Sequence, residues 1–283
     1  MGASILITGA AGMLGRTLSQ RFSGQRLHAL MRQDLDITVE KDVFSSFEKL
    51  APDVVIHCAA MTQVDLCESE QEQAYVVNQR GSENIARASQ AIGARLIGIS
   101  TDYVFRGDGE RPYCEEDETQ PQTVYGQSKL AGERAILELC EKSLVARVAW
   151  LYGPSGPSFL HTMLRLGQVD GDPLQVVNDQ IGNPTSTLAV AAHLELLLET
   201  DLSGIVHLTC EGEATWFDFT RAIFQRTGLS REVESCTSDV YPRPAPRPAN
   251  SRLEKSVLAR CDLPPMPSWQ EALDEFLRLH PKG

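Results

Sequence analysis

Short apolar runs alternate along the first half of the chain with segments whose apolar residues recur at helical spacing. The first run, Ser4 to Thr8, lacks alternation of apolar and polar residues, which is typical of a strand buried on both faces of a parallel sheet. Similar strands are predicted at residues 27–31, 54–60, 96–100 and 144–151. Between them, helical spacing predicts helices at 14–22, 43–50 (starting behind Thr38), 74–92 and 125–140. This order predicts an α/β fold with a Rossmann-type, doubly wound parallel sheet.

The pattern becomes less regular after residues 153–157, which are rich in glycine and proline. It predicts helices at 159–166, 187–199 and 216–227 (with Thr215 as N-cap), strands at 174–177 and 205–208, and a last helix opened by the capping box Ser268–Glu271. The strand at 205–208 is expected to return to the first sheet. We therefore expect a dinucleotide-binding domain of residues 1–151 plus returning segments at about 185–208. A smaller α/β substrate-binding lobe is expected from about 152–184 and 209–283.

The composition and charge of the chain limit the classes of molecule that it is expected to bind. The chain has 283 residues, 42% of them hydrophobic, which is enough for one large domain or two smaller ones. Its net charge of -12 argues against a general affinity for nucleic acid or for an anionic membrane, and no apolar run reaches membrane-spanning length. The N-terminus leads directly into a strand without a basic leader, so a cytoplasmic protein is expected. Seven scattered cysteines predict reduced thiols and no metal site.

A glycine-rich turn follows the first strand. The run Gly9-Ala10-Ala11-Gly12-Met13-Leu14-Gly15 lies between that strand and a predicted helix, which is the context that a dinucleotide fingerprint requires. Glycines let the backbone approach a pyrophosphate, whose charge is stabilised by the free N–H groups at the helix start. The turn therefore predicts a dinucleotide site.

Tyr125 and Lys129 are four residues apart on a predicted helix, so their side chains lie on one face. A phenol beside an ammonium is expected to have a lowered pKa and to exchange protons with a substrate oxygen near neutral pH. By itself the spacing also fits an inert pair on an exposed helical face, so its meaning depends on the rest of the chain.

Four stretches occur in the order found in the extended short-chain dehydrogenase/reductase superfamily, which the chain resembles. They are the glycine turn, Ala59-Ala60, Ser100-Thr101, and the helix segment from Tyr125 to Lys129. Longer runs are more specific and resemble the dTDP-4-dehydrorhamnose reductases; they are residues 58–65, 100–107, 125–133, 147–153, 179–185 and 247–253. The resemblance covers nearly the whole chain.

The resemblance implies NAD(P)H-dependent reduction of the C4 keto group of dTDP-4-dehydro-6-deoxy-L-mannose (dTDP-4-dehydro-L-rhamnose) to dTDP-L-rhamnose. In this chain Tyr125 would protonate the developing alkoxide. Lys129 would hold the nicotinamide ribose and lower the pKa of Tyr125, while Thr101 would hydrogen-bond the substrate oxygen. A homodimer is compatible with this resemblance.

The resemblance also assigns binding residues. The implied cofactor-binding set is Gly9, Gly12, Met13, Leu14, Arg32, Asp36, Ile37, Ala59, Ala60, Thr62, Tyr125 and Lys129. The implied substrate-binding set is Val64, Thr101, Asp102, Tyr125, Trp150, Asn183, Arg247 and Asn250. Trp150 equally fits ordinary packing at a strand end.

The residues after the second strand bear on the choice of cofactor. Arg32 stands where an arginine can bind a 2′-phosphate, and Arg16 at the first helix start is a second candidate for that contact. Asp34 and Asp36 follow at the distance where an acid can bind a free 2′-hydroxyl, although Asp36 matches the adenine contact of the family better. We expect NADPH and leave NADH open.

Four alternative functions compete with this interpretation. Sugar-nucleotide dehydratases carry an Asp and then a Glu after the Thr, but Tyr103 follows Asp102 here, and the GDP-fucose-forming epimerase-reductases would have a cysteine at Tyr103. Another nucleotide-sugar reductase or epimerase stays open. So does a non-catalytic, NADP-binding protein like the regulatory subunit of methionine adenosyltransferase, which resembles these reductases and binds a protein partner.

Two further segments have competing interpretations. Residues 241–248 alternate proline with other residues and fit a polyproline ligand or a stiff loop, but the resemblance favours a loop of the substrate lobe near the nucleotide. The acidic run from Glu115 to Glu118 is expected to be a solvated loop.

Overall fold

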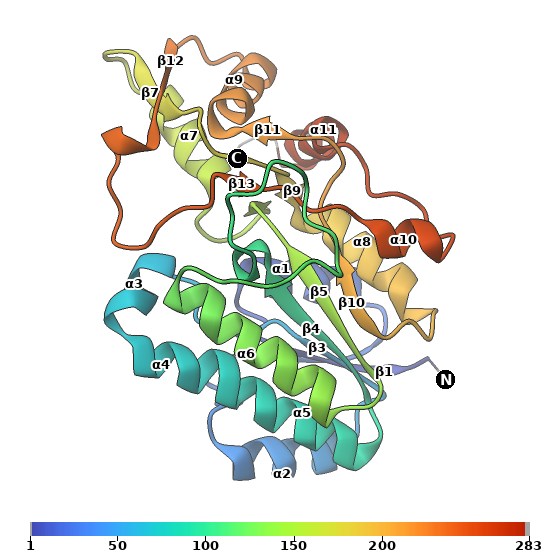
Figure 1. Ribbon diagram of the computed structural model, residues 1–283. Helices are drawn as coiled ribbons and strands as arrows, with labels where there is room; N and C mark the ends of the chain where they lie inside the picture. Colours follow the sequence, from blue (N-terminus) through green and yellow to red (C-terminus); the bar gives the residue numbers. More distant parts are fainter. Residues whose placement is uncertain (1, 281–283) are drawn as a thin grey trace.

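A six-stranded parallel sheet forms the centre of the computed structural model, which describes residues 2–280. Its strands are β1 Ser4–Thr8, β2 Arg26–Leu30, β3 Val54–His57, β4 Arg95–Thr101, β5 Ser143–Val148 and β10 Gly204–His207. They lie in the order β10-β5-β4-β3-β1-β2 (Figure 1). The chain thus crosses to the other side of β1 between β2 and β3, which is where open α/β sheets bind ligands. This confirms the Rossmann-type sheet and the return of the strand predicted at 205–208.

Helices cover both faces of this sheet. On one face α1 Met13–Arg21 packs beside α8 Thr187–Leu198, and on the other lie α2 Glu40–Leu50, α4 Gln71–Tyr75, α5 Gly81–Ile92 and α6 Val124–Leu139 (Figure 1). Successive side chains of a strand point to opposite faces, so Ile5 and Ile7 belong to one core while Leu6 belongs to the other. Burial on both faces explains why the strands read as continuous apolar runs.

The helix predicted at 74–92 begins earlier and is interrupted. It starts with α4 and passes through a π-helical turn, η1 Val76–Arg80, before α5. In this turn the buried Asn78 accepts from the Met61 amide (2.8 Å) and donates to the Met61 carbonyl (3.1 Å) and to Ser128 Oγ (2.9 Å). The turn therefore ties the loop after β3 to α6. The residues of this turn carry no sequence signal that separates it from a regular helix, so the sequence pattern did not reveal it.

Other boundaries differ at the ends of elements. The strand predicted at 54–60 ends at His57, and the helix expected behind Thr38 has Val39 as its N-cap. The strand predicted at 144–151 is divided into β5 and β6 Leu151–Tyr152, because Trp150 adopts a left-handed backbone with φ of +47°. No L-residue continues a strand in that conformation.

The second half of the chain contributes short strands around a further group of helices. The strands form three small sheets: β11 Ala214–Thr215 with β8 Ile181–Gly182 and β13 Asn250–Ser251, β12 Val233–Cys236 with β7 Leu174–Val177, and β6 with β9 Thr185–Ser186. The remaining helical segments are α3 Val64–Ser69, η2 Asp102–Val104, α7 Phe159–Gly167, α9 Trp216–Thr227, η3 Ser238–Val240, α10 Ser256–Arg260 and α11 Trp269–Leu279. The capping box predicted at Ser268 is formed, and the predicted N-cap Thr215 also forms a capping box, with Asp218. The division into two lobes stays a prediction.

The acidic run is less solvated than expected. Glu115 is only 6% exposed, and its Oε1 accepts from the backbone amides of His207 (3.2 Å) and Val257 (3.3 Å). Glu116 pairs instead with Arg260 at the surface. The expectation of a solvated loop is therefore wrong for Glu115, which joins β10 to α10.

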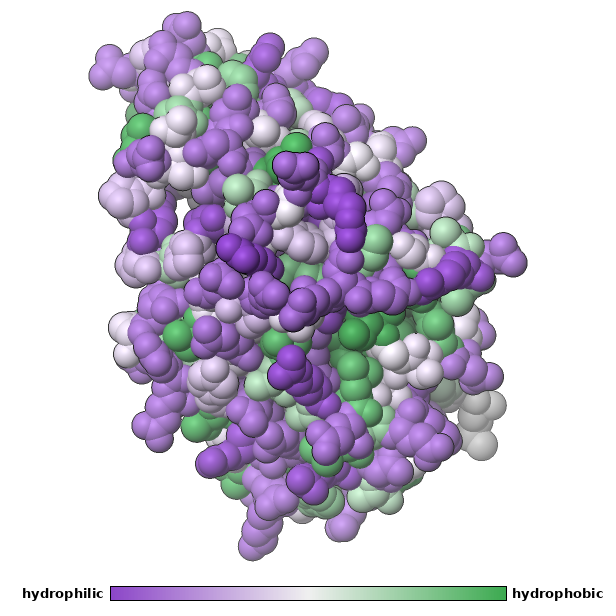
Figure 2. Space-filling view, viewed as in Figure 1, coloured by the Kyte–Doolittle hydropathy of each residue, from purple (hydrophilic) through white to green (hydrophobic). Residues whose placement is uncertain are grey.

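Within residues 2–280, no helix is long and apolar enough to cross a bilayer. Hydrophilic residues predominate on the face seen in Figure 2, and hydrophobic residues show between them in separate groups.

Candidate active site

A cavity of about 1350 Å³ lies at the carboxyl end of the parallel strands. Its walls come from the turn after β1, the loops after β3, β4 and β5, helix α6, and the loops around β7, β8 and β13. Pockets for one small molecule usually measure roughly 300–1,000 Å³, so this cavity has room for two ligands side by side. The predicted residues that line it are Gly9, Gly12, Met13, Leu14, Arg32, Asp36, Ile37, Ala59, Ala60, Thr62, Val64, Thr101, Asp102, Tyr125, Lys129, Trp150 and Arg247.

The glycine turn has the form of a phosphate cradle. Gly9 has φ of +68°, and a Cβ there would lie 2.6 Å from the Ala59 amide nitrogen. Gly15 is equally constrained, because a Cβ would lie 2.3 Å from the Gly9 carbonyl oxygen. The N-cap Gly12 brings no side chain to the start of α1, so the amides of that first turn are free for a ligand in the cavity. A dinucleotide pyrophosphate fits this arrangement.

Arg32 and Asp36 line the cavity beyond β2. Asp36 Oδ1 accepts from the Thr38 hydroxyl (2.7 Å) and amide (3.0 Å). These bonds, and more weakly the charge of Arg32, lower the pKa of Asp36. Arg16 lies at the exposed start of α1, where its Nε donates to the Ala11 carbonyl (2.8 Å). Of the two arginines predicted as contacts of a 2′-phosphate, Arg32 therefore lines the cavity and Arg16 does not.

Helix α6 presents Tyr125 and Lys129 to the cavity as predicted, but their electrostatics differ from the expectation. Burial raises the pKa of Tyr125, opposed only in part by the hydrogen bond with Thr101, and Lys129 does not lower it. Lys129 Nζ donates to the Ile99 carbonyl (2.7 Å), and burial lowers the pKa of its ammonium to about 8. The predicted lowering of the Tyr125 pKa by Lys129 is thus wrong for this structure, because desolvation outweighs the neighbouring charge.

Thr101 and Asp102 end β4 beside this pair. Thr101 Oγ1 donates to Asp102 Oδ1 (3.0 Å) and accepts from the Tyr103 amide (3.3 Å). Asp102 is 5% exposed, and its Oδ2 has no protein partner among the described residues. Burial raises the pKa of Asp102 to about 6, while hydrogen bonds with Ser251 and Thr101 oppose the shift. This carboxyl is placed to bond a polar group in the cavity.

Trp150 packs against another side chain and also lines the cavity, so its two interpretations, as a packing residue and as a substrate contact, are compatible. Its indole stacks on Trp216 with 3.4 Å between ring centroids and 6° between ring planes. Its backbone carbonyl accepts from the Thr185 amide (3.1 Å). The left-handed backbone at the end of β5 turns the indole into the cavity wall.

Arg247 reaches the cavity but is already paired. Its Nη1 and Nη2 donate to the two carboxylate oxygens of Asp65, at 2.9 and 2.8 Å. Asp65 also accepts from the Ala245 amide (3.2 Å), so the pair joins α3 to the loop at 241–248. That loop lines the cavity through Tyr241, Arg243, Arg247 and Pro248, as expected for the substrate-lobe reading of the proline-rich segment.

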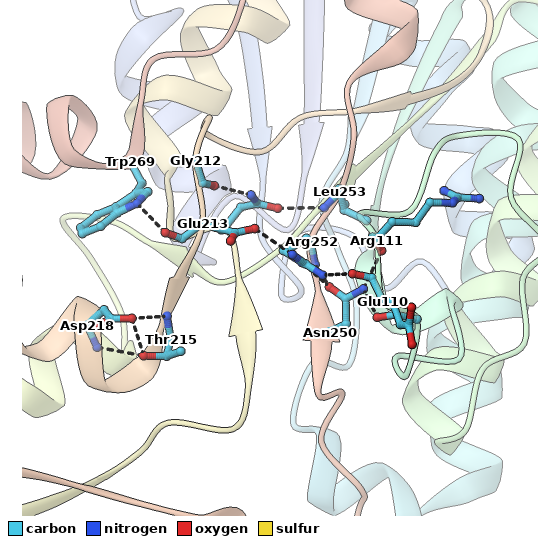
Figure 3. Close-up of polar contacts among 12 residues, drawn as sticks. Glu110, Arg111, Gly212, Glu213, Thr215, Asp218, Asn250, Arg252, Leu253 and Trp269 are labelled. Atoms are coloured by element: carbon cyan, nitrogen blue, oxygen red, sulfur yellow. Dashed lines mark hydrogen bonds and ion pairs between the residues drawn. The ribbon is translucent and has the colours of Figure 1, made fainter.

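Asn183 and Asn250, both predicted to bind substrate, are buried and do not line the cavity. Asn183 donates to the Gly212 carbonyl (2.6 Å) and accepts from the Leu253 amide (2.8 Å). Asn250 donates to the carbonyls of Gly109 and Arg111 and accepts from the Arg252 guanidinium (Figure 3). Because their polar atoms bond other groups of the protein, both asparagines hold loops together. The structure therefore does not support the prediction that they contact the substrate directly.

Several cavity residues were not found from the sequence. They include Phe159, Gln180, Trp216, Arg243 and Ser251. Phe159 and Trp216 begin predicted helices, and the other three lie in loops or on a short strand, so no local pattern marked them as ligand-facing. Trp216, directly after the N-cap Thr215, was the most visible signal, because the first turn of a helix often faces a ligand.

Comparison with known proteins gives consistent results over nearly the whole chain. The model of the family described as the RmlD substrate binding domain matches residues 3–280. A dTDP-4-dehydrorhamnose reductase of Mycolicibacterium smegmatis is 43% identical over 281 residues, covering 97% of this chain and 85% of the relative. The spore coat polysaccharide biosynthesis protein SpsK of Bacillus subtilis is 38% identical over 276 residues, covering 97% and 96%.

A solved structure is similar in fold as well as sequence. The crystal structure of dTDP-4-dehydrorhamnose reductase from Bacillus anthracis in complex with NADP superposes with a TM-score of 0.96 at 37% identity. The alignment covers 99% of this chain and all of that one (100%).

Proposed function

The chain belongs to the RmlD substrate-binding-domain family, and on this premise we propose that it is an NADPH-dependent reductase of dTDP-4-dehydro-L-rhamnose. The product is dTDP-L-rhamnose. The observation that carries the proposal is one cavity in which Thr101, Tyr125 and Lys129 meet the glycine cradle after β1. NADH remains the second candidate cofactor, since the preference depends chiefly on Arg32.

Tyr125 is the proton donor in this proposal. When bound, the reduced nicotinamide supplies the hydride that the substrate carbonyl accepts. Because burial raises its pKa, Tyr125 stays protonated at neutral pH and can donate to the oxygen on which negative charge develops. Thr101 orients that oxygen through its hydroxyl. Lys129, buried at the same wall, holds a cofactor ribose.

The remaining walls account for the rest of the substrate. Asp102 has a buried, unpartnered Oδ2 that suits a sugar hydroxyl. Val64 and Trp150 supply apolar surface beside it. Arg243 and Arg247, the latter in its ion pair with Asp65, line the cavity, and a nucleoside diphosphate requires positive charge there.

We propose a cytoplasmic location, as for other enzymes that use nucleotide sugars and reduced nicotinamide. All seven cysteines are free in the structure, which supports a reducing compartment. A homodimer is compatible with the proposal but does not enter the chemistry.

Nucleotide binding separates this enzyme from a non-catalytic regulatory subunit. Titration calorimetry with dTDP on the protein already saturated with NADPH should show a saturable heat, with UDP and GDP as controls for the base. NADPH binding without any heat from dTDP would favour the regulatory subunit. A stronger response to UDP or GDP would favour another nucleotide-sugar reductase.

A further inference from the structure

Trp150 adopts a backbone that its surroundings must enforce. Its φ of +47° lies in the left-handed region, which a bulky L-residue rarely occupies. Such conformations persist where neighbouring groups over-determine them, and they concentrate at functional sites. Trp150 lies two residues after the end of β5 and lines the cavity, so the groups that fix its indole also fix the shape of that cavity.

Two neighbours confine the indole of Trp150. Gly182 on β8 leaves the space that the ring occupies, because a Cβ there would lie 2.5 Å from Trp150 Cε2. Trp216 stacks on the ring with 3.4 Å between centroids and 6° between planes. Removing Trp216 would give the indole room to turn away from the cavity wall, whereas a side chain at Gly182 would displace the ring.

Trp216 is itself anchored more firmly than a surface tryptophan. It is the first residue of α9, whose N-cap Thr215 is fixed by a capping box. Its Nε1 donates to Gln180 Oε1 (3.0 Å), and Gln180 Nε2 donates to Ser238 Oγ (2.8 Å). Phe159 packs against it with 4.3 Å between ring centroids. The hydrogen bond fixes the rotation of the indole, while the packing fixes its position.

We propose that Trp216 is a positioning residue, which with Gln180 holds the Trp150 indole as a rigid wall for the nucleotide-sugar substrate. This inference rests on the proposed function for the identity of the substrate. The wall acts on the sugar and not on the cofactor, because the cofactor cradle after β1 is built from other elements. Loss of Trp216 should therefore weaken substrate binding and leave NADPH binding unchanged.

The chain offers a direct readout, because it contains three tryptophans. Two stacked indoles couple excitonically, which produces a paired positive and negative band in the far-ultraviolet circular dichroism spectrum. Trp269 provides the matched control: it is buried, its Nε1 donates to the Glu213 carbonyl (3.1 Å), and it does not line the cavity. Trp269→Phe should keep the paired band, the KM for the nucleotide sugar and the affinity for NADPH.

Three substitutions test the wall. Trp216→Leu should abolish the paired band and raise the KM for dTDP-4-dehydro-L-rhamnose by about tenfold, the upper range for one aromatic contact. Trp216→Phe retains a stacking ring and should restore KM to within about threefold of wild type. Gln180→Ala keeps all of the aromatic packing, and it should reduce the amplitude of the band and raise KM by a few-fold.

The outcomes are distinguishable. A KM within about twofold of wild type in both Trp216→Leu, with the band lost, and Gln180→Ala, with the band reduced, would overturn the inference. So would an equal loss of NADPH affinity, since that would report general damage to the fold. If Trp216→Leu does not fold, Gln180→Ala decides by the same two measurements. An inactive wild-type protein that still shows the paired band would contradict the proposed function instead, and dTDP affinity would then replace KM as the readout.

Discussion

At the scale of single residues, proton donation by Tyr125 depends on its pKa, which burial raises more than its hydrogen bond with Thr101 lowers it. A phenol that must donate a proton at neutral pH has to remain protonated until the hydride arrives, and burial ensures this. Lys129, with its pKa lowered to about 8, can lose part of its charge in mildly alkaline solution. The same desolvation therefore moves the two pKa values in opposite directions, and in both groups it favours the neutral form.

Replacing Tyr125 by Phe tests the proton donor. We expect Tyr125→Phe to reduce kcat by at least about 100-fold, because general acid catalysis typically contributes 10²–10⁴. The affinity for NADPH, measured by fluorescence titration, should stay within about threefold of wild type, since the cradle after β1 is unaffected. A variant that keeps more than about a tenth of wild-type turnover would exclude Tyr125 as the general acid.

Arg32 tests cofactor choice at the same scale. Arg32→Ala should weaken NADPH binding by roughly 1.5–3 kcal/mol, the usual worth of a hydrogen bond to a charged group. NADH, which lacks the 2′-phosphate, should lose much less. Arg16→Ala is the matched control, because Arg16 does not line the cavity. Equal losses for the two cofactors, measured by calorimetry, would show that Arg32 does not bind the phosphate.

At the scale of elements, the glycine turn shows what a sequence pattern can predict. The strand, turn and helix between Ser4 and Arg21 were predicted almost residue by residue, because each has a strong local signal. The π-helical turn at Val76–Arg80 and the strands of two residues at β6, β8 and β13 have none. Their formation depends on contacts between distant segments, such as Asn78 with Met61.

Gly9→Ala tests the turn as a unit. Its φ of +68° and a Cβ only 2.6 Å from the Ala59 nitrogen leave no unstrained arrangement for an alanine. We expect a loss of roughly 1–3 kcal/mol in the free energy of unfolding, together with at least about tenfold weaker NADPH binding. Gly24→Ala is the control, because nothing lies within 4 Å of its Cβ position. Similar behaviour of the two variants in urea denaturation and cofactor titration would contradict this account of the turn.

The same limits apply to the candidate site. Residues at the carboxyl ends of β1, β3 and β4 could be predicted, because consecutive parallel strands bring their ends to one edge. Asn183 and Asn250 were misplaced because their motifs lie near the site in sequence, whereas their polar atoms are used in clasping loops. Trp216 and Gln180 were missed because their role depends on a stack formed with Trp150 across the fold.

At the scale of the whole molecule, buried histidines make stability depend on pH. Burial lowers the pKa of His57 and of His207 from 6.5 to about 3 each, with the charges of Lys129 and Arg147 as smaller causes. Below pH 6.5 the unfolded chain binds protons that the folded protein does not, so the stability of the fold decreases as the pH falls. Asp102, whose pKa is raised to about 6, acts in the opposite direction below that pH.

We therefore expect the free energy of unfolding to decrease between pH 6.5 and pH 5, the range in which the two histidines outweigh Asp102. His207→Gln should reduce the slope by up to one proton, or about 1.4 kcal/mol per pH unit. Urea denaturation at several pH values measures both slopes. An unchanged slope in His207→Gln would show that His207 is not held neutral in the fold.

We propose that the protein reduces a nucleotide-sugar ketone in this cavity. The most direct measurement supplies purified protein with dTDP-4-dehydro-L-rhamnose and NADPH and follows absorbance at the reduced nicotinamide band. We expect the NADPH consumed to equal the dTDP-L-rhamnose formed. The reaction should be faster with NADPH than with NADH, and it should be lost in Tyr125→Phe. Protein that binds NADPH and dTDP but consumes no NADPH with this substrate would contradict it.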